Sequence, residues 1–80
     1  MNIDDLRPGR QKVLRLFNAL RDDIVAGRFS ETQTLPGSRA LAEMLQISRG
    51  TVNMAYAMLA AEGLITIRSK ASPQILYRAP

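Results

Sequence analysis

A cluster of polar residues past the middle of the chain carries side chains of the types that bind phosphates and base edges. Ser48 and Thr51 offer hydroxyls, and Arg49 offers a planar fork for a guanine edge or a phosphate. Gly50 leaves its backbone uncovered for close approach. Asn53, about one helical turn further along, suits an adenine edge. Such contacts need a helix that begins here, because free N–H groups and the helix dipole favour phosphate.

Three more basic residues flank this cluster. Arg39 lies before it, and Arg68 and Lys70 lie in a polar turn after it. Arg39 can instead pair with Glu43, but an exposed pair at this spacing contributes only about 0.2–0.5 kcal/mol and does not exclude a phosphate contact. Lys70 either contacts phosphate or keeps an edge hairpin soluble. The alternative for Arg49 and Asn53 is that they are ordinary exposed polar residues with no contact to DNA.

Three helices are expected to position these side chains. Apolar residues at three- and four-residue steps predict a helix over 10–26, which Gly27 ends. Ser38 is expected to cap a second helix over 39–45. Ser48 is expected to cap a third helix over 49–62, and Gly63 ends it. The expected buried faces are Val13, Leu16, Phe17, Leu20 and Ile24 in the first helix, Leu41, Ala42 and Leu45 in the second, and Val52, Ala55, Tyr56 and Leu59 in the third. Met54 and Met58 lie off this third face, and their role stays open.

Loop and strand signals complete the pattern. Residues 28–37 read as a loop, with Phe29 and Leu35 tucked beneath it and a short strand possible at 33–35. Residues 64–67 and 73–77 read as two strands, and Pro73 makes the second an edge strand or a brief one. The polar stretch between them forms the turn of a small hairpin.

The order of these elements predicts a mainly α fold with a small β-hairpin wing, a three-helix winged helix-turn-helix. The domain is expected over 10–77, with 1–9 a tail and 78–80 the start of a linker or a cut end. In this fold the third helix enters the DNA major groove and the wing reaches the backbone or the minor groove. The candidate contacts to double-stranded DNA are Arg39, Ser48, Arg49, Gly50, Thr51, Asn53, Arg68 and Lys70.

Composition agrees with a small basic domain and excludes several classes of function. The chain has 80 residues, a net charge of +4 and a pI of about 10.4, which favours a polyanionic partner. It has no cysteine or histidine, so we expect no metal, cofactor or catalytic site. It has no apolar run of about 20 residues and no signal peptide, so a cytoplasmic, nucleoid-associated location is expected.

Two segments resemble the GntR-type bacterial transcriptional regulators. Residues 35–42, Leu-Pro-Gly-Ser-Arg-Ala-Leu-Ala, are similar to their LPS-x-R-x-LA segment. Residues 48–65 are similar to their S-R-x-T-V…A-Y…L…E-G-L-I pattern, and the Ala-Tyr pair leans toward the MocR-like subgroup. The resemblance covers residues 13–68. The turn at 68–73 departs from it, because the wing of this family is usually glycine-rich.

The resemblance implies a winged helix that precedes a larger effector-binding and dimerising domain, with Arg39, Arg49, Thr51 and Asn53 facing DNA. We therefore expect this chain alone to be monomeric and the full-length form to be a homodimer through a C-terminal domain absent here. The main alternative is a winged helix that serves only protein–protein contacts. A membrane-surface role for the first helix is disfavoured, since its apolar face is needed to cover the other helices.

Overall fold

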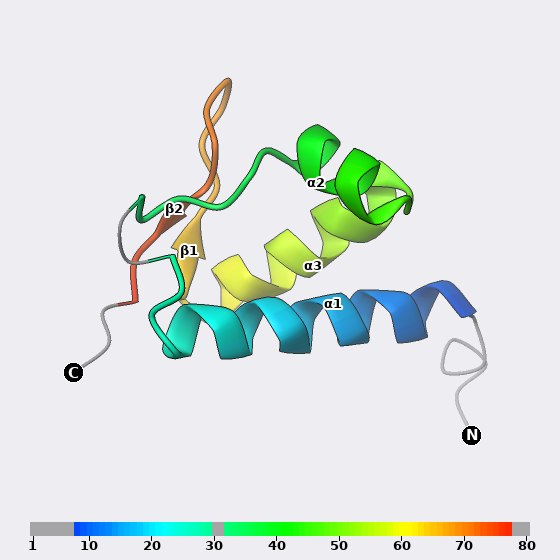
Figure 1. Ribbon diagram of the computed structural model, residues 1–80, viewed down its shortest axis with the longest axis horizontal. Coiled ribbons are helices and arrows are strands. Elements are labelled where there is room, and N and C mark those ends of the chain that lie inside the picture. The colour runs from blue at the N-terminus through cyan, green and yellow to red at the C-terminus, as the bar shows by residue number, and fades with distance from the viewer. Residues whose placement is uncertain (1–7, 30–31, 78–80) are drawn as a thin grey trace.

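A computed structural model describes residues 8–29 and 32–77 of the chain. It contains the helices α1 (Pro8–Val25), α2 (Ser38–Leu45) and α3 (Arg49–Ala61), followed by the strands β1 (Ile65–Thr66) and β2 (Gln74–Ile75) (Figure 1). This confirms the expected mainly helical winged helix-turn-helix. Most of the expected tail, residues 1–7, and the expected linker, residues 78–80, lie outside the described residues.

The helix α1 lies along one side of the molecule, with α3 packed across it (Figure 1). It begins at Pro8, two residues before the expected start, because proline needs no N–H partner in the first turn. At its end Gly27 adopts a positive φ of 80°, as expected. The N–H groups of Gly27 and Arg28 bond to the carbonyls of Ile24 and Asp23, which closes the last turn.

The hydrophobic core lies where the three helices and the wing meet. Its buried residues are Val13, Phe17, Leu20, Ile24, Leu35, Leu41, Ala42, Val52, Ala55, Tyr56, Leu59, Ile65 and Ile75. Leu16, Phe29, Ile47 and Tyr77 are partly buried against it. The expected faces of α1 and α3 are thus confirmed, apart from the half-buried Leu16.

Two expectations about α2 are wrong. Leu45 is 47% exposed, because Gln46 adopts a left-handed conformation that turns the chain and brings Ile47 against the core instead. Ser38 is also not the N-cap: it is the first residue of the helix, and Gly37 caps it with no side-chain bond. The cap lies one residue earlier because the carbonyl of Gly37 accepts the N–H of Leu41.

The wing is shorter than its sequence pattern predicts. Its strands pair antiparallel, with Ile65 opposite Ile75 and Thr66 opposite Gln74. The stretch expected as a short strand at 33–35 forms an isolated bridge from Thr34 to Gln74, so it lies beside β2. This anchors the wing to the loop that leads into α2. No helix among the described residues is long and apolar enough to cross a membrane.

Candidate nucleic-acid interface

The start of α3 is an exposed, capped helix N-terminus. The Oγ atom of Ser48 accepts a hydrogen bond from the N–H of Thr51 at 3.2 Å, which confirms Ser48 as the cap. The two hydroxyl oxygens also lie 2.9 Å apart. Arg49 and Gly50 are exposed in the first turn. A Cβ at Gly50 would meet nothing closer than the Ser48 Oγ at 3.9 Å, so packing within the chain does not require glycine there.

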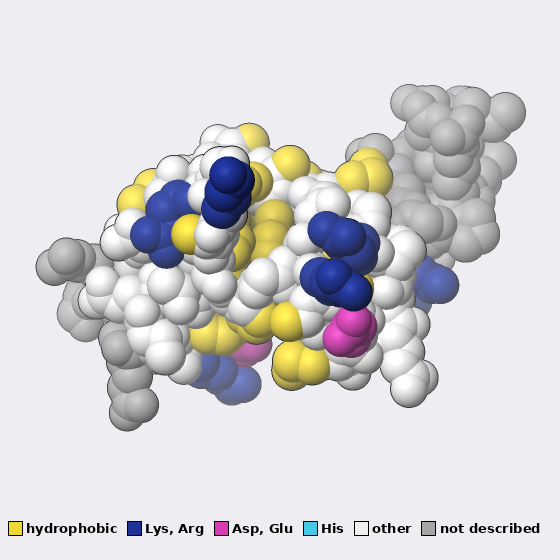
Figure 2. Space-filling view, turned by 90° about the horizontal axis from the view of Figure 1, so that it is seen from above, with side chains coloured by type: hydrophobic (Ala, Val, Ile, Leu, Met, Phe, Trp, Pro, Cys, Tyr) yellow, Lys and Arg dark blue, Asp and Glu magenta, His cyan; other side chains and the backbone are white. Residues whose placement is uncertain are grey.

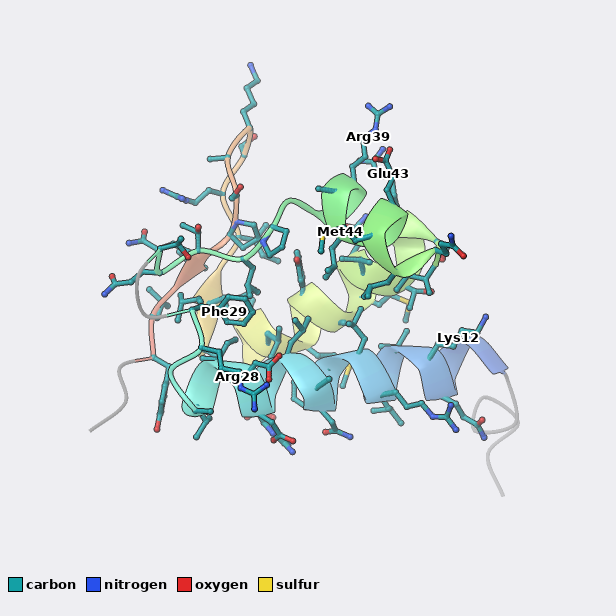
Figure 3. The ribbon with its side chains drawn as sticks, viewed as in Figure 1. Lys12, Arg28, Phe29, Arg39, Glu43 and Met44 are labelled. Atoms are coloured by element: carbon teal, nitrogen blue, oxygen red, sulfur yellow. The ribbon has the colours of Figure 1, made fainter. Side chains whose placement is uncertain are left out.

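The helix α2 carries Arg39 in its first turn. The Nε of Arg39 lies 3.6 Å from a carboxylate oxygen of Glu43, so the ion pair weighed from the sequence does form. Both side chains point away from α1 and the core (Figure 3). Because both are largely exposed, the pair contributes little stability and leaves Arg39 available to another anion.

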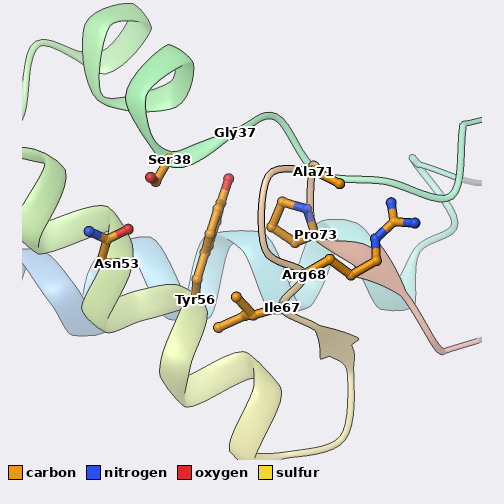
Figure 4. A pocket seen from close by; sticks show the side chains of 8 residues that line it. All are labelled: Gly37, Ser38, Asn53, Tyr56, Ile67, Arg68, Ala71 and Pro73. Carbon is orange, nitrogen blue, oxygen red and sulfur yellow. The ribbon is translucent and has the colours of Figure 1, made fainter.

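The wing turn is held by Arg68. Its Nε and Nη2 both donate to the carbonyl oxygen of Ser72, at 3.1 and 2.8 Å. The guanidinium therefore closes its own turn and points away from α3 (Figure 4). Lys70 lies in the exposed turn with a positive φ of 61°, a conformation that glycine usually supplies. This explains how a wing turn without glycine retains the tight geometry.

An open cleft of about 310 Å³ lies between the wing and the two helices of the helix-turn-helix. Gly37, Ser38 and Asn53 line its helical side, and the ring of Tyr56 stands between the two sides (Figure 4). Ile67, Ala71 and Pro73 line its wing side. The cleft brings Asn53 into one site with the wing, which the sequence alone did not indicate.

Basic side chains gather in two groups on one face of the molecule (Figure 2). One group lies over the wing and the other over α2 and the start of α3, with hydrophobic and uncharged surface between them. Within residues 8–29 and 32–77, Arg49 and Lys70 form no ion pair, and Arg39 forms only the exposed pair with Glu43. The face shared by α2, α3 and the wing therefore attracts polyanions.

The profile of the family described as bacterial regulatory proteins, gntR family, matches residues 12–74. The chain belongs to this family. Members of the GntR family are DNA-binding transcription regulators, so this winged helix-turn-helix is a DNA-binding module of that type. The resemblance seen in the sequence is confirmed across almost the whole described chain.

Curated bacterial relatives agree with the GntR assignment. The chain is 36% identical over 77 residues, or 94% of its length, to the HTH-type transcriptional regulator TauR of Rhodobacter capsulatus. It is 42% identical over 55 residues, or 69% of its length, to the probable rhizopine catabolism regulatory protein MocR of Rhizobium meliloti. This agrees with the expected similarity to the MocR-like subgroup. The chain spans only 16% of TauR and 11% of MocR, so it corresponds to one module of much longer proteins.

Sequence reasoning missed the residues of the cleft other than Asn53 and Arg68. Ser38 was read as a cap, although its position in the first turn of α2 places it in the cleft. Ile67 falls at the end of the expected strand 64–67, but strand pairing ends at Thr66 and Ile67 is 54% exposed. No group of three His, Cys, Asp or Glu side chains that could hold a metal occurs in the described ranges.

Proposed function

We propose that this GntR-family domain binds double-stranded DNA in a sequence-specific way, with α3 in the major groove and the wing near the backbone or the adjacent minor groove. The observation that carries the proposal is that the basic side chains over α2 and the exposed start of α3 share one face with those over the wing (Figure 2). A recognition helix with basic elements on both sides fits one groove and the backbones that border it.

Each residue has a separate role in this arrangement. Arg49 and Asn53 reach base edges, while Ser48, Gly50 and Thr51 bring the start of α3 against a phosphate. Arg39 binds a backbone phosphate in place of its weak ion pair with Glu43. In the wing, Lys70 contacts the DNA, and Arg68 contributes positive charge while its bonds to Ser72 hold the turn.

We further propose that the isolated domain is monomeric and binds a single half-site weakly. One recognition helix reads only a few base pairs. Regulators of this kind usually gain affinity and specificity by binding two DNA half-sites as a dimer. The relatives are several times longer than this chain, so a C-terminal dimerising domain outside it supplies the second copy. The domain catalyses no reaction, binds no cofactor, and acts on the chromosome in the cytoplasm.

A selection from random duplex DNA, followed by sequencing, tests the proposed function. The expected result is an enriched half-site of a few base pairs. The alternative, a winged helix used only for protein contacts, predicts that no sequence is enriched over the input pool. The same selection is run in parallel with the variant Arg49→Gln, which keeps the fold but lacks the guanidinium fork. Its enriched motif should lose information at one or two adjacent positions.

A further inference from the structure

The cleft between the wing and the helix-turn-helix separates α3 from the wing, the two elements that the proposed function assigns to neighbouring grooves. Adjacent major and minor grooves of B-DNA are separated by one sugar–phosphate strand. When α3 occupies the major groove and Lys70 reaches the next minor groove, this strand must cross the space between them. We propose that the cleft binds that strand, with Ile67 packed against a deoxyribose. This inference rests on the proposed function and deepens it.

The lining of the cleft suits both parts of a sugar–phosphate chain. On the helical side, the hydroxyl of Ser38 and the amide of Asn53 are donors that can reach a phosphate oxygen (Figure 4). On the wing side, Ile67, Ala71 and Pro73 have hydrocarbon side chains, which match the apolar face of a sugar ring. A strand lying between the two sides meets donors on one flank and carbon on the other.

Charge and exposure favour the DNA backbone over other occupants. Arg39 follows the cleft residue Ser38 in α2, and Arg49 lies one helical turn before Asn53 in α3. Lys70 precedes Ala71 in the wing, so positive charge lies close to both sides of the cleft and favours a polyanion. The only cationic side chain that lines the cleft, Arg68, is held on Ser72 and leaves the space open. Ile67 remains 54% exposed, and a backbone sugar would cover it.

A matched pair of carboxylate substitutions in the wing tests this proposal. Ile67 and Leu76 are 54% and 52% exposed in the same hairpin, but only Ile67 lines the cleft. The variants Ile67→Glu and Leu76→Glu change net charge equally, so long-range electrostatics cancel in the comparison. The measurement is affinity for a labelled duplex carrying the wild-type selected site. We expect Ile67→Glu to weaken binding at least about tenfold and Leu76→Glu less than about threefold, because only the first carboxylate faces a phosphate strand.

The uncharged pair Ile67→Ala and Leu76→Ala separates sugar packing from electrostatics. Ile67→Ala should weaken binding by about threefold to tenfold and leave the slope of log K against log salt unchanged, since losing apolar contact releases no counterions. Leu76→Ala should have neither effect. Thermal unfolding followed by circular dichroism checks that each of the four variants is folded at the assay temperature before its affinity is compared.

Equal affinities for Ile67→Glu and Leu76→Glu would overturn the cleft proposal while the wild-type domain still binds the duplex. If the wild-type domain binds no duplex at all, the proposed function fails and this inference fails with it. The two failures are therefore distinguished by the wild-type measurement alone.

Discussion

The phenol oxygen of Tyr56, on α3, donates a 2.6 Å hydrogen bond to the carbonyl oxygen of Pro36, in the segment that leads into α2. This bond joins α3 to the segment that leads into α2, beside the cleft that Tyr56 lines. Tyr56→Phe keeps the buried ring but removes the bond, and should reduce the free energy of unfolding by about 1 kcal/mol. For a domain of this size that lowers the melting temperature by about 4–8 °C. An unchanged melting temperature would show that the bond adds no net stability.

Stability should fall at high pH through the same residue. Burial raises the pKa of Tyr56 from 10.0 to about 12. Between these values the folded chain holds a proton that the unfolded chain releases, so stability is complete below pH 10 and declines as pH rises toward 12. The decline should approach about 1.4 kcal/mol per pH unit. Denaturant unfolding across this range should show it in the wild type and in Tyr77→Phe, but not in Tyr56→Phe. Identical pH profiles for the two variants would refute the assignment.

Replacing Arg49 by alanine and replacing Arg39 by alanine should affect DNA binding differently. Arg49 lies in the first turn of α3, so Arg49→Ala should cost about 1–3 kcal/mol on the selected site and relax sequence preference. Arg39→Ala should weaken all sequences alike and make the salt slope shallower by about one unit. Arg28→Ala is the matched control, because Arg28 lies on the α1 side, away from Arg39 (Figure 3). Equal losses on selected and random duplexes for both variants would contradict this division of roles.

We expect Lys70 to lower the stability of the folded domain and to raise its affinity for DNA. Its positive φ of 61° strains a residue with a Cβ, so Lys70→Gly should stabilise the folded domain by up to about 1 kcal/mol. The same change removes a wing charge, so affinity for duplex DNA should fall and the salt slope should become shallower. Lys70→Gln separates the two effects, since glutamine lacks the charge but remains strained in this left-handed conformation, so it should weaken DNA binding without stabilising the fold. Melting curves and binding isotherms that move in the same direction for Lys70→Gly would be inconsistent with this role.

The sequence predicts the parts of the fold that depend on periodicity and capping. The core residues of α3, the cap at Ser48, and the positive φ of Gly27 and Gly63 all follow from local patterns. Local patterns do not predict which non-glycine residues adopt a left-handed conformation. The left-handed turn at Gln46 and the exposure of the preceding Leu45 are therefore not predicted. The bonds of Arg68 to Ser72 and the exposure of Ile67 depend on where strand pairing ends, which the residue types do not encode.

Part of the candidate site also follows from the sequence. The start of α3 is recognisable because cap, arginine and glycine stand in a row before an apolar stripe. The cleft is not recognisable, since it joins residues up to 36 positions apart, from Gly37 to Pro73. The two methionines also prove unlike each other: Met54 is largely exposed, whereas Met58 packs against the core.

The salt dependence of duplex binding tests the central claim most directly. The proposed face neutralises roughly four to six phosphates, so log K should fall against log salt with a slope of about −4 to −5. Fluorescence anisotropy with a labelled duplex across a range of salt concentrations measures this slope, and Arg39→Ala should shift it by about one unit. A slope of this size that responds to Arg39 is the result our account predicts. A flat response, or one that Arg39→Ala leaves unchanged, would contradict DNA binding through this face.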